Sequence, residues 1–418
     1  MKLTIRGLRW YMVGLIALAT ALNYFDRQTL ALLAATLQDA LGISTVQYAY
    51  MTAAFLSSYT IMYAVSGRLI DRLGTRRGFA IFVAGWSAVD ALHALARTAL
   101  QFGFFRFLLG AVEPANFPAG VKAVSEWFPM RQRALAVGIF NSGTAVGAAI
   151  AAPLVTWIAL RFGWRYTFLA GAALSASWTA LWLLLYRAPR RHPWLGAEEL
   201  ALIEDGAGPA TVRPVPIGCL LRRREAWGCI VARMLTDPIS YFFAFWMPKF
   251  LQQERGFDLR AIGRYYWIPY VSLALGNIAG GALPALLVRG GWSVDRARKT
   301  VMLAASCVIP ACFILITRSL SPSLAVALIS VAMFCHAAWG NMTLPAEVFP
   351  MHAVGSVSGF GGAVGSLVGA AAMLLIGWTT AASSFNMIFI VCAALPLTAW
   401  AAVCVLVPDL GRVREIAP

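Results

Sequence analysis

Ionisable side chains stand inside two segments of this sequence that are otherwise almost entirely apolar. Asp26 and Arg27 lie in the first apolar stretch, and Arg106 and Glu113 lie in the fourth. Charged groups in hydrocarbon are costly, so they usually face a bundle interior or a water-filled cavity and mark an ion or substrate path. Arginine offers a planar fork that suits a carboxylate, and a buried acid can take up and release protons as solvent access changes. The pattern predicts a transport path that binds an anion and handles protons.

Helical spacing places Arg106 and Glu113 two turns apart, about 10 Å along one helix face. That separation is too long for a direct contact, but both side chains can line one cavity. The alternative is that the charged residues form buried ion pairs that only hold helices together. The residue types leave this alternative open, and either role requires helices packed into a bundle.

The composition of the chain indicates a membrane protein. Of its 418 residues, 60% are hydrophobic and 12% are charged, whereas soluble domains contain about 25% charged residues. A membrane-spanning helix needs about 20 mainly apolar residues. We therefore predict an all-α membrane protein with twelve transmembrane helices, near residues 9–35, 47–67, 78–96, 99–121, 134–160, 164–186, 226–250, 262–288, 300–317, 322–345, 355–378 and 385–407.

The net charge of +16 reflects membrane topology rather than a nucleic-acid partner. Most Lys and Arg residues lie at the amino terminus and in alternate loops, near residues 68–77, 122–133, 187–224 and 289–299. Positively charged loops stay in the cytoplasm, so we expect both termini there, in a bacterial cytoplasmic (inner) membrane. The basic start leads into an apolar run that contains Asp26 and Arg27, which predicts a first span rather than a cleaved signal.

A polar segment divides the chain into two halves. We predict an N-terminal six-helix bundle at residues 1–186, a cytoplasmic linker at 187–225 and a C-terminal six-helix bundle with a short tail at 226–418. Residues 126–130 (Glu-Trp-Phe-Pro-Met) have a counterpart at 347–351 (Glu-Val-Phe-Pro-Met). This weak internal repeat supports the division, because parallel repeats place a substrate site at the interface of the halves.

Cysteine and histidine usage gives no sign of a metal site or an enzyme. The seven cysteines are scattered, mostly through apolar stretches, and the chain has four histidines. Neither a disulfide framework nor a zinc pattern fits this distribution, and no set of nucleophile and base is present. We expect no enzyme activity, no metal and no cofactor, with the proton as the coupling ion.

The loop predicted after the second span has a distinctive spacing of glycine and charge. Its residues 67–77 contain Gly67, Asp71, Arg72, Gly74 and Arg76. Two glycines permit a tight turn, and the arginines hold the loop inside. The Gly-x-x-x-Asp-Arg-x-Gly spacing resembles the signature of the major facilitator superfamily. That resemblance implies two six-helix bundles and alternating access, with Asp71 helping to latch one conformational state.

Other short sequence motifs resemble one family within this superfamily. The run at residues 23–27 (Asn-Tyr-Phe-Asp-Arg) and the run from Arg106 to Gly120 are similar to the anion:cation symporter family. Within that family the chain is most similar to bacterial hexuronate carriers, whose Pro-Ala-Gly-x-Lys-Ala and Ala-Val-Gly-x-Phe-Asn strings match residues 118–123 and 136–141. The similarity covers nearly the whole chain.

The resemblance implies a role for each residue that matches the family's motifs. Substrate-binding positions fall on Tyr24, Arg27 and Tyr59, and proton-coupling positions fall on Asp26 and Glu113. The fourth-helix arginine falls on Arg106, which would tune the two acids. Some hexuronate carriers have Thr where this chain has Asp26, so the overall similarity and the proton site point to slightly different subgroups.

The second half offers fewer candidates. His336, Trp339 and Asn341 in the tenth span would face the charged first half and bind sugar hydroxyls, although helix packing explains each of them equally well. Two other sets of spacings suggest structural pairs. Asp90 with His93 is one of them, for which a proton relay is the alternative, and Arg233 with Asp237 is the other.

We predict a proton-coupled symporter of a sugar acid, with a hexuronate such as galacturonate or glucuronate as the substrate. An aldonate or aldarate, or another organic anion, is the alternative substrate. A membrane sensor of the same fold and an exchanger without proton coupling also stay open. The expected partners are a small organic anion, protons and the lipid bilayer, and the protein is expected to be a monomer.

Overall fold

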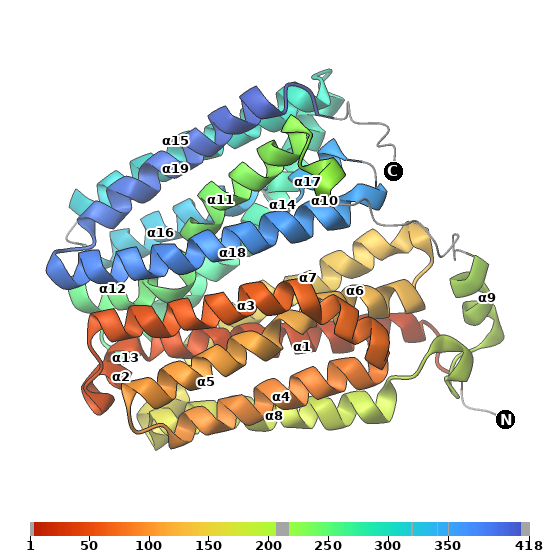
Figure 1. Ribbon diagram of the computed structural model, residues 1–418, viewed down its shortest axis with the longest axis horizontal. Helices are drawn as coiled ribbons and strands as arrows, with labels where there is room; N and C mark the ends of the chain where they lie inside the picture. Colours follow the sequence, from red (N-terminus) through yellow and green to blue (C-terminus); the bar gives the residue numbers. More distant parts are fainter. Residues whose placement is uncertain (1–3, 206–216, 319–320, 341, 350, 411–418) are drawn as a thin grey trace.

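The computed structural model describes residues 4–205, 217–318, 321–340, 342–349 and 351–410, and its regular elements are all helices. The first part of the chain contains α1 (Leu8–Leu32), α2 (Ala34–Leu41), α3 (Thr45–Leu73), α4 (Thr75–Leu95), α5 (Ala99–Val112), the 3₁₀ turn η1 (Glu113–Ala115), α6 (Asn116–Trp127), α7 (Met130–Phe162) and α8 (Trp164–Leu185). These helices form the first lobe, drawn from red to yellow in Figure 1.

The rest of the chain forms a second lobe after a short connection. The connection contains η2 (Pro189–Arg191), α9 (Ala197–Asp205) and α10 (Ile217–Leu220). The second lobe, green to blue in Figure 1, contains α11 (Arg224–Phe245), α12 (Met247–Glu254), α13 (Leu259–Tyr265), α14 (Trp267–Arg289), α15 (Val294–Arg318), α16 (Pro322–Trp339), α17 (Leu344–Val348), α18 (Met351–Ala382) and α19 (Asn386–Leu406). We retain residues 1–186, 187–225 and 226–418 as our proposal for the domain boundaries.

Eight helical segments within the described residues are long and apolar enough to cross a membrane: α4, α7, α8, α13 with α14, α15, α16 with α17, α18 and α19. The other four predicted spans lie on α1, α3, α5 with α6, and α11. Three of these, α1, α5 with α6, and α11, carry buried charged side chains, among them Arg27, Arg106 and Asp237. The described residues of the twelve predicted spans therefore lie mainly on helices, and the fold is that of an all-α membrane protein.

One predicted loop is wrong. Residues 68–73, expected in a loop, continue α3 as far as Leu73, and α4 begins at Thr75. Only Gly74 lies between the two helices, with a φ of 76° that favours glycine. Gly67 is therefore a helical residue rather than a turn residue, because nothing between it and Gly74 interrupts the helix.

The predicted repeat has a structural counterpart in each lobe. Helices α6 and α17 end just before Phe128 and Phe349, and both phenylalanines have an extended backbone that leads into the next long helix. The glutamate of each string is held by a polar partner: Tyr186 donates to Glu126 at 2.7 Å, and Arg298 donates to Glu347 at 3.0 Å. The two strings thus occupy equivalent places.

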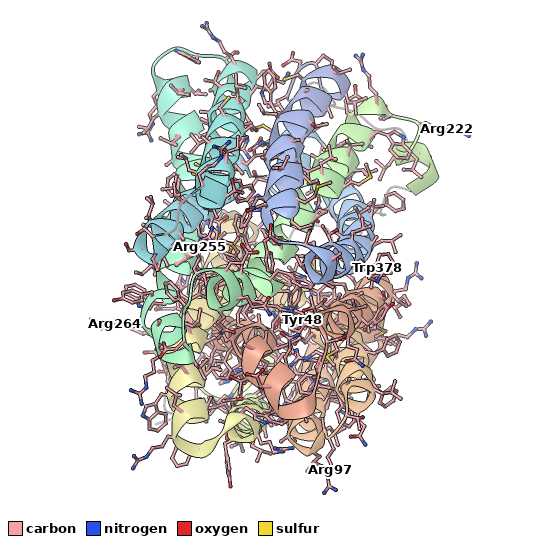
Figure 2. The ribbon with its side chains drawn as sticks, turned by 90° about the vertical axis from the view of Figure 1, so that its left-hand side faces the viewer. Tyr48, Arg97, Arg222, Arg255, Arg264 and Trp378 are labelled. Carbon is pink, nitrogen blue, oxygen red and sulfur yellow. The ribbon has the colours of Figure 1, made fainter. Side chains whose placement is uncertain are left out.

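The two lobes are joined at the end of the molecule where α2, α12 and α13 lie, opposite the start of α1 (Figure 1). We call this the joined end. Figure 2 looks at this end and places Tyr48 at the boundary between the lobes. The Tyr48 hydroxyl donates to the Phe245 carbonyl at 2.6 Å, and Lys249 Nζ donates to Thr45 Oγ1 at 3.0 Å. A Cβ at Gly377 of α18 would lie only 2.1 Å from Ala49 Cβ of α3, so the lobes approach closely here.

Candidate functional site

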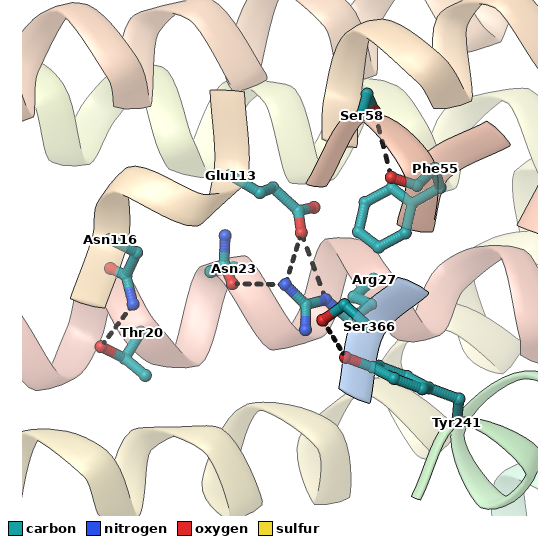
Figure 3. A network of polar contacts seen from close by, with 9 residues as sticks. All are labelled: Thr20, Asn23, Arg27, Phe55, Ser58, Glu113, Asn116, Tyr241 and Ser366. Carbon is teal, nitrogen blue, oxygen red and sulfur yellow. Dashed lines mark hydrogen bonds and ion pairs between the residues drawn. The ribbon is translucent and has the colours of Figure 1, made fainter. Parts of the chain in front are cut away.

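The centre of the site is an ion pair between α1 and the break in the fourth predicted span. Arg27 Nη2 and Nε donate to Glu113 Oε2 at 2.8 and 3.2 Å. Figure 3 shows the guanidinium between Glu113 and the side-chain oxygen of Asn23, Oδ1, which lies 3.5 Å from Nη2. Arg27 is 7% exposed and Glu113 is 1% exposed, so the pair is almost fully removed from solvent.

Local sequence explains how Glu113 reaches Arg27. Pro114 has no N–H to donate back along α5, so the α-helix ends at Val112 and the chain continues as η1, which begins at Glu113. Gly110 lets α5 press against α3, because a Cβ there would lie 2.2 Å from the Phe55 carbonyl oxygen. Ser58 strengthens the contact by donating to the Phe107 carbonyl at 2.6 Å.

Aromatic rings surround the Arg27 guanidinium. Its Cζ lies 4.8 Å from the centre of the Tyr24 ring, 4.9 Å from that of Tyr59 and 5.3 Å from that of Phe55. Such cation–π contacts hold the charge with little water around it. The structure thus brings together four residues predicted from the sequence, Tyr24, Arg27, Tyr59 and Glu113, from α1, α3 and η1.

Arg106 is also buried in the first lobe, and it has no hydrogen-bond partner at Nε or Nη2 within the described part of the chain. It is 1% exposed and lies 5.7 Å from the centres of the Phe102 and Phe168 rings. Its charge acts on Asp90, Glu113 and Asp26. This position agrees with the predicted influence of Arg106 on the acids, which stays a prediction.

Asp26 faces away from Arg27, because adjacent residues on a helix point in different directions. Its Oδ2 accepts a hydrogen bond from Ser175 of α8 at 3.2 Å, and its carboxyl lies against that of Asp90 on α4. The charged residues therefore do not pair with their neighbours in the sequence. Arg27 pairs with Glu113, and Asp26 meets another acid.

Sequence reasoning left Asp90 out of the site as a structural partner of His93, and the structure gives it a different neighbour. His93 Nδ1 bonds to the Val89 carbonyl at 2.8 Å, while Asp90 Oδ1 lies 4.0 Å from that nitrogen. His93 therefore does not satisfy Asp90. The sequence did contain a sign that Asp90 belongs to the site, because this acid lies in an apolar span just as Asp26 does.

His336 and Trp339, the described candidates in the second lobe, form hydrogen bonds within that lobe. His336 Nε2 lies 2.6 Å from Ser240 Oγ on α11. Trp339 is 1% exposed and donates from Nε1 to Ser306 of α15 at 2.8 Å, which is a packing position inside this lobe. Asn341 lies outside the described residues. The predicted pair of Arg233 and Asp237 is confirmed, with Nη2 and Oδ2 2.9 Å apart.

The predicted latch residues lie in the first lobe, at the junction between α3 and α4. Asp71 pairs with Lys122 of α6 at 2.8 Å, so its partner belongs to the same lobe. Arg76 donates to the carbonyl oxygen of Leu183 on α8, and Arg72 lies in the last turn of α3. The latch function of these residues stays a prediction.

Comparison with known families decides the class of this protein. The family model described as Major Facilitator Superfamily matches residues 16–373. The chain belongs to the major facilitator superfamily. Like other members of this superfamily it is a multi-pass membrane protein.

Solved structures of superfamily members share its fold. A bacterial homolog of the human lysosomal transporter Spinster, in an inward-facing and occupied conformation, superposes with a TM-score of 0.72 at 17% identity over 97% of this chain and 96% of the other. The inward-open xylose transporter XylE from E. coli superposes with a TM-score of 0.74 at 15% identity, covering 97% and 98% of the two chains.

Curated relatives from the superfamily align along most of the sequence. The hexuronate transporter of Escherichia coli strain K12 is 36% identical over 402 residues, which cover 94% of this chain and 92% of the relative. The galacturonate transporter of Dickeya chrysanthemi is 40% identical over 288 residues, 68% of this chain and 83% of the relative. The D-galactonate transporter of Escherichia coli O6:H1 is 27% identical over 97% of both chains. These relatives are transporters rather than enzymes.

Proposed function

We propose that this protein is a proton-coupled symporter of a sugar acid and that its substrate is a hexuronate such as galacturonate or glucuronate. The relatives named for hexuronate and galacturonate, at 36% and 40% identity, support this choice of substrate. The single structural observation that carries the mechanism is the buried ion pair between Arg27 and Glu113.

The ion pair couples substrate binding to protonation. A sugar carboxylate that docks on Arg27 competes with Glu113 for the same guanidinium nitrogens. Breaking a buried ion pair while one partner stays charged costs about 3–5 kcal/mol. Protonation of Glu113 removes that cost, because the acid becomes neutral as the substrate supplies the new negative charge. Substrate and proton therefore bind together.

Residues around Arg27 would bind the rest of the sugar. We assign the hydroxyls of Tyr24 and Tyr59 to the sugar hydroxyls, because both rings already lie within 5 Å of the Arg27 Cζ. We assign His336 to the same role from the second lobe, where its link to Ser240 holds the ring in place. Trp339 and Asn341 remain weaker candidates, and Arg106 would tune Glu113 and Asp26.

Alternating access would follow from rocking of the two lobes. With both termini in the cytoplasm of a bacterial cell, the joined end faces outside and the structure represents a state closed to the exterior. Close approaches between α3 and α18 would have to open before substrate enters. We propose that the protein works as a monomer in the cytoplasmic (inner) membrane and that no cofactor takes part beyond the coupling proton.

Aldonates and aldarates are the second candidate substrates. Asp26 favours them, because the family resemblance implies an aspartate at this position in galactonate and aldarate carriers, and the relative named for D-galactonate aligns along 97% of this chain. Relatives named as probable galactarate/D-glucarate transporters, one of them from Escherichia coli strain K12, are 30% identical. Competition between the acids would separate the two substrate classes.

The test is uptake of labelled glucuronate into proteoliposomes under an imposed inward proton gradient. We expect accumulation that collapses when the gradient is removed and that unlabelled galacturonate suppresses more strongly than galactonate or glucarate. Uptake that ignores the gradient would indicate an exchanger without proton coupling, and binding without uptake would indicate a sensor. Either result would contradict the proposal. Arg97→Ala serves as the control variant, since this arginine points away from the molecule in Figure 2.

A further inference from the structure

Two aspartates from different helices meet in the interior of the first lobe. The carboxyl groups of Asp26 on α1 and Asp90 on α4 border the same small space beside Gly171, and the two residues are 2% and 1% exposed. Gly171 of α8 closes the space beside them, because a Cβ there would lie 2.4 Å from Asp26 Oδ1 and 3.3 Å from Asp90 Oδ2. The contact is thus built by three helices and has no room for a larger side chain.

The carboxyl pair lacks the donors that two anions would need. Ser175 donates to Asp26 Oδ2, but the Oδ1 atoms of both aspartates have no hydrogen-bond donor within the described residues. Buried charges are normally paired and hydrogen-bonded, and two carboxylates in contact repel each other. We propose that Asp26 and Asp90 hold one proton between them and that this pair, including Asp90, is a proton-binding site of the coupling machinery.

The buried charges around the two aspartates also favour a single shared proton. Among its described residues, the first lobe buries two guanidinium groups, Arg27 and Arg106, together with the three acids Asp26, Asp90 and Glu113. A single proton on the acids makes this set neutral, which is the least costly state in a low-dielectric interior. Glu113 already accepts two hydrogen bonds from Arg27. The proton therefore belongs on the aspartate pair.

His93 also lies beside the pair, with Nδ1 4.0 Å from Asp90 Oδ1, but its surroundings do not suit the proton. Its Nδ1 is used by the Val89 carbonyl, and its Nε2 has no partner in the described part of the chain. The ring lies between Phe102 and Phe168, with centroids 4.9 and 5.2 Å away. A second N–H would find no acceptor there, and the neighbouring Arg106 would repel the added charge.

The place of this pair in the transport cycle rests on the proposed function. When a substrate carboxylate binds Arg27, it adds one negative charge, which a second proton on Glu113 balances. The aspartate pair and Glu113 are then two separate proton sites, one that holds a proton before substrate arrives and one that fills with substrate. Removal of either aspartate carboxyl abolishes the first site.

Infrared spectroscopy of the purified protein in lipid, at neutral pH and without substrate, tests the shared proton directly. We expect the carbonyl stretching band of a protonated carboxylic acid in the native protein and its loss in Asp26→Asn and in Asp90→Asn. The matched control is Asp39→Asn, which changes an exposed acid and leaves the band in place. A native protein without the band, or a band that survives in either buried variant, overturns the proposal.

A transport measurement tests the role of the pair in coupling. Because the asparagine amide at position 90 donates to an ionised Asp26, Asp90→Asn keeps the contact but needs no proton. We expect this variant to lose accumulation driven by a proton gradient and to keep counterflow exchange of labelled substrate. Native accumulation by Asp90→Asn overturns the coupling role. If the native protein itself fails to accumulate a sugar acid, the proposed function fails, while the infrared result still decides whether the pair holds a proton.

Discussion

Glu113→Gln separates the binding of substrate from the binding of the proton. In the native protein at alkaline pH, an incoming carboxylate must displace a charged Glu113 from Arg27, where Nη2 and Oε2 lie 2.8 Å apart. Breaking such a buried pair costs about 3–5 kcal/mol, whereas breaking the bond from a guanidinium to a neutral amide costs about 1.5–3 kcal/mol. The difference of about 2 kcal/mol corresponds to roughly a 30-fold tighter Kd for the variant.

The effect of pH on substrate affinity should differ between the native protein and the variant. Native affinity for the acid should weaken as pH rises, because Glu113 loses the proton that substrate binding requires. Glu113→Gln has no proton to lose at this position, so its affinity should stay high over the same range. Calorimetric titration of glucuronate at several pH values measures both curves.

Transport assays complete the test. The variant should carry out counterflow exchange and should fail to accumulate substrate against its gradient, because substrate no longer brings a proton with it. Accumulation equal to that of the native protein would refute the coupling role of Glu113. Weaker binding than native at alkaline pH would refute the competition for Arg27.

Three other changes test separate parts of the structure. Arg27→Ala should abolish binding of the acid in calorimetry, whereas Arg97→Ala should bind normally; binding by the Arg27 variant would place the carboxylate elsewhere. Gly377→Ala inserts a methyl group where only 2.1 Å separates it from Ala49, so it should widen the joined end; an unchanged distance distribution between spin labels on the two lobes would contradict this. Asp71→Asn removes an exposed ion pair worth about 0–1 kcal/mol, so thermal stability should barely change; a latch role requires transport to fall nonetheless.

Much of the fold was predictable because it depends on local composition. A run of apolar residues long enough to cross a bilayer becomes a helix wherever it lies, since the backbone must satisfy its own hydrogen bonds in lipid. The predicted spans accordingly lie on helices, while their limits shift where a single residue decides them, as at Gly74. The superfamily was likewise predictable from the spacing around Asp71.

The contacts between site residues could not be predicted from the sequence in the same way. Arg27 and Glu113 were both selected, because charge in an apolar span is visible in the sequence. Their direct contact was not predicted, and Asp90 was assigned to His93 instead of Asp26. Spacing along one helix reports only neighbours on that helix.

The amino-acid sequence by itself determined that this chain spans a membrane, that it has the superfamily fold and that acids and arginines stand among its apolar helices. Tertiary structure alone decided which of these charges meet. Close approaches such as those at Gly110 and Gly171 set the rotation and separation of the helices. Rotation about a helix axis decides whether a side chain faces a guanidinium, another acid or a packed ring, and that rotation depends on contacts between segments far apart in the chain.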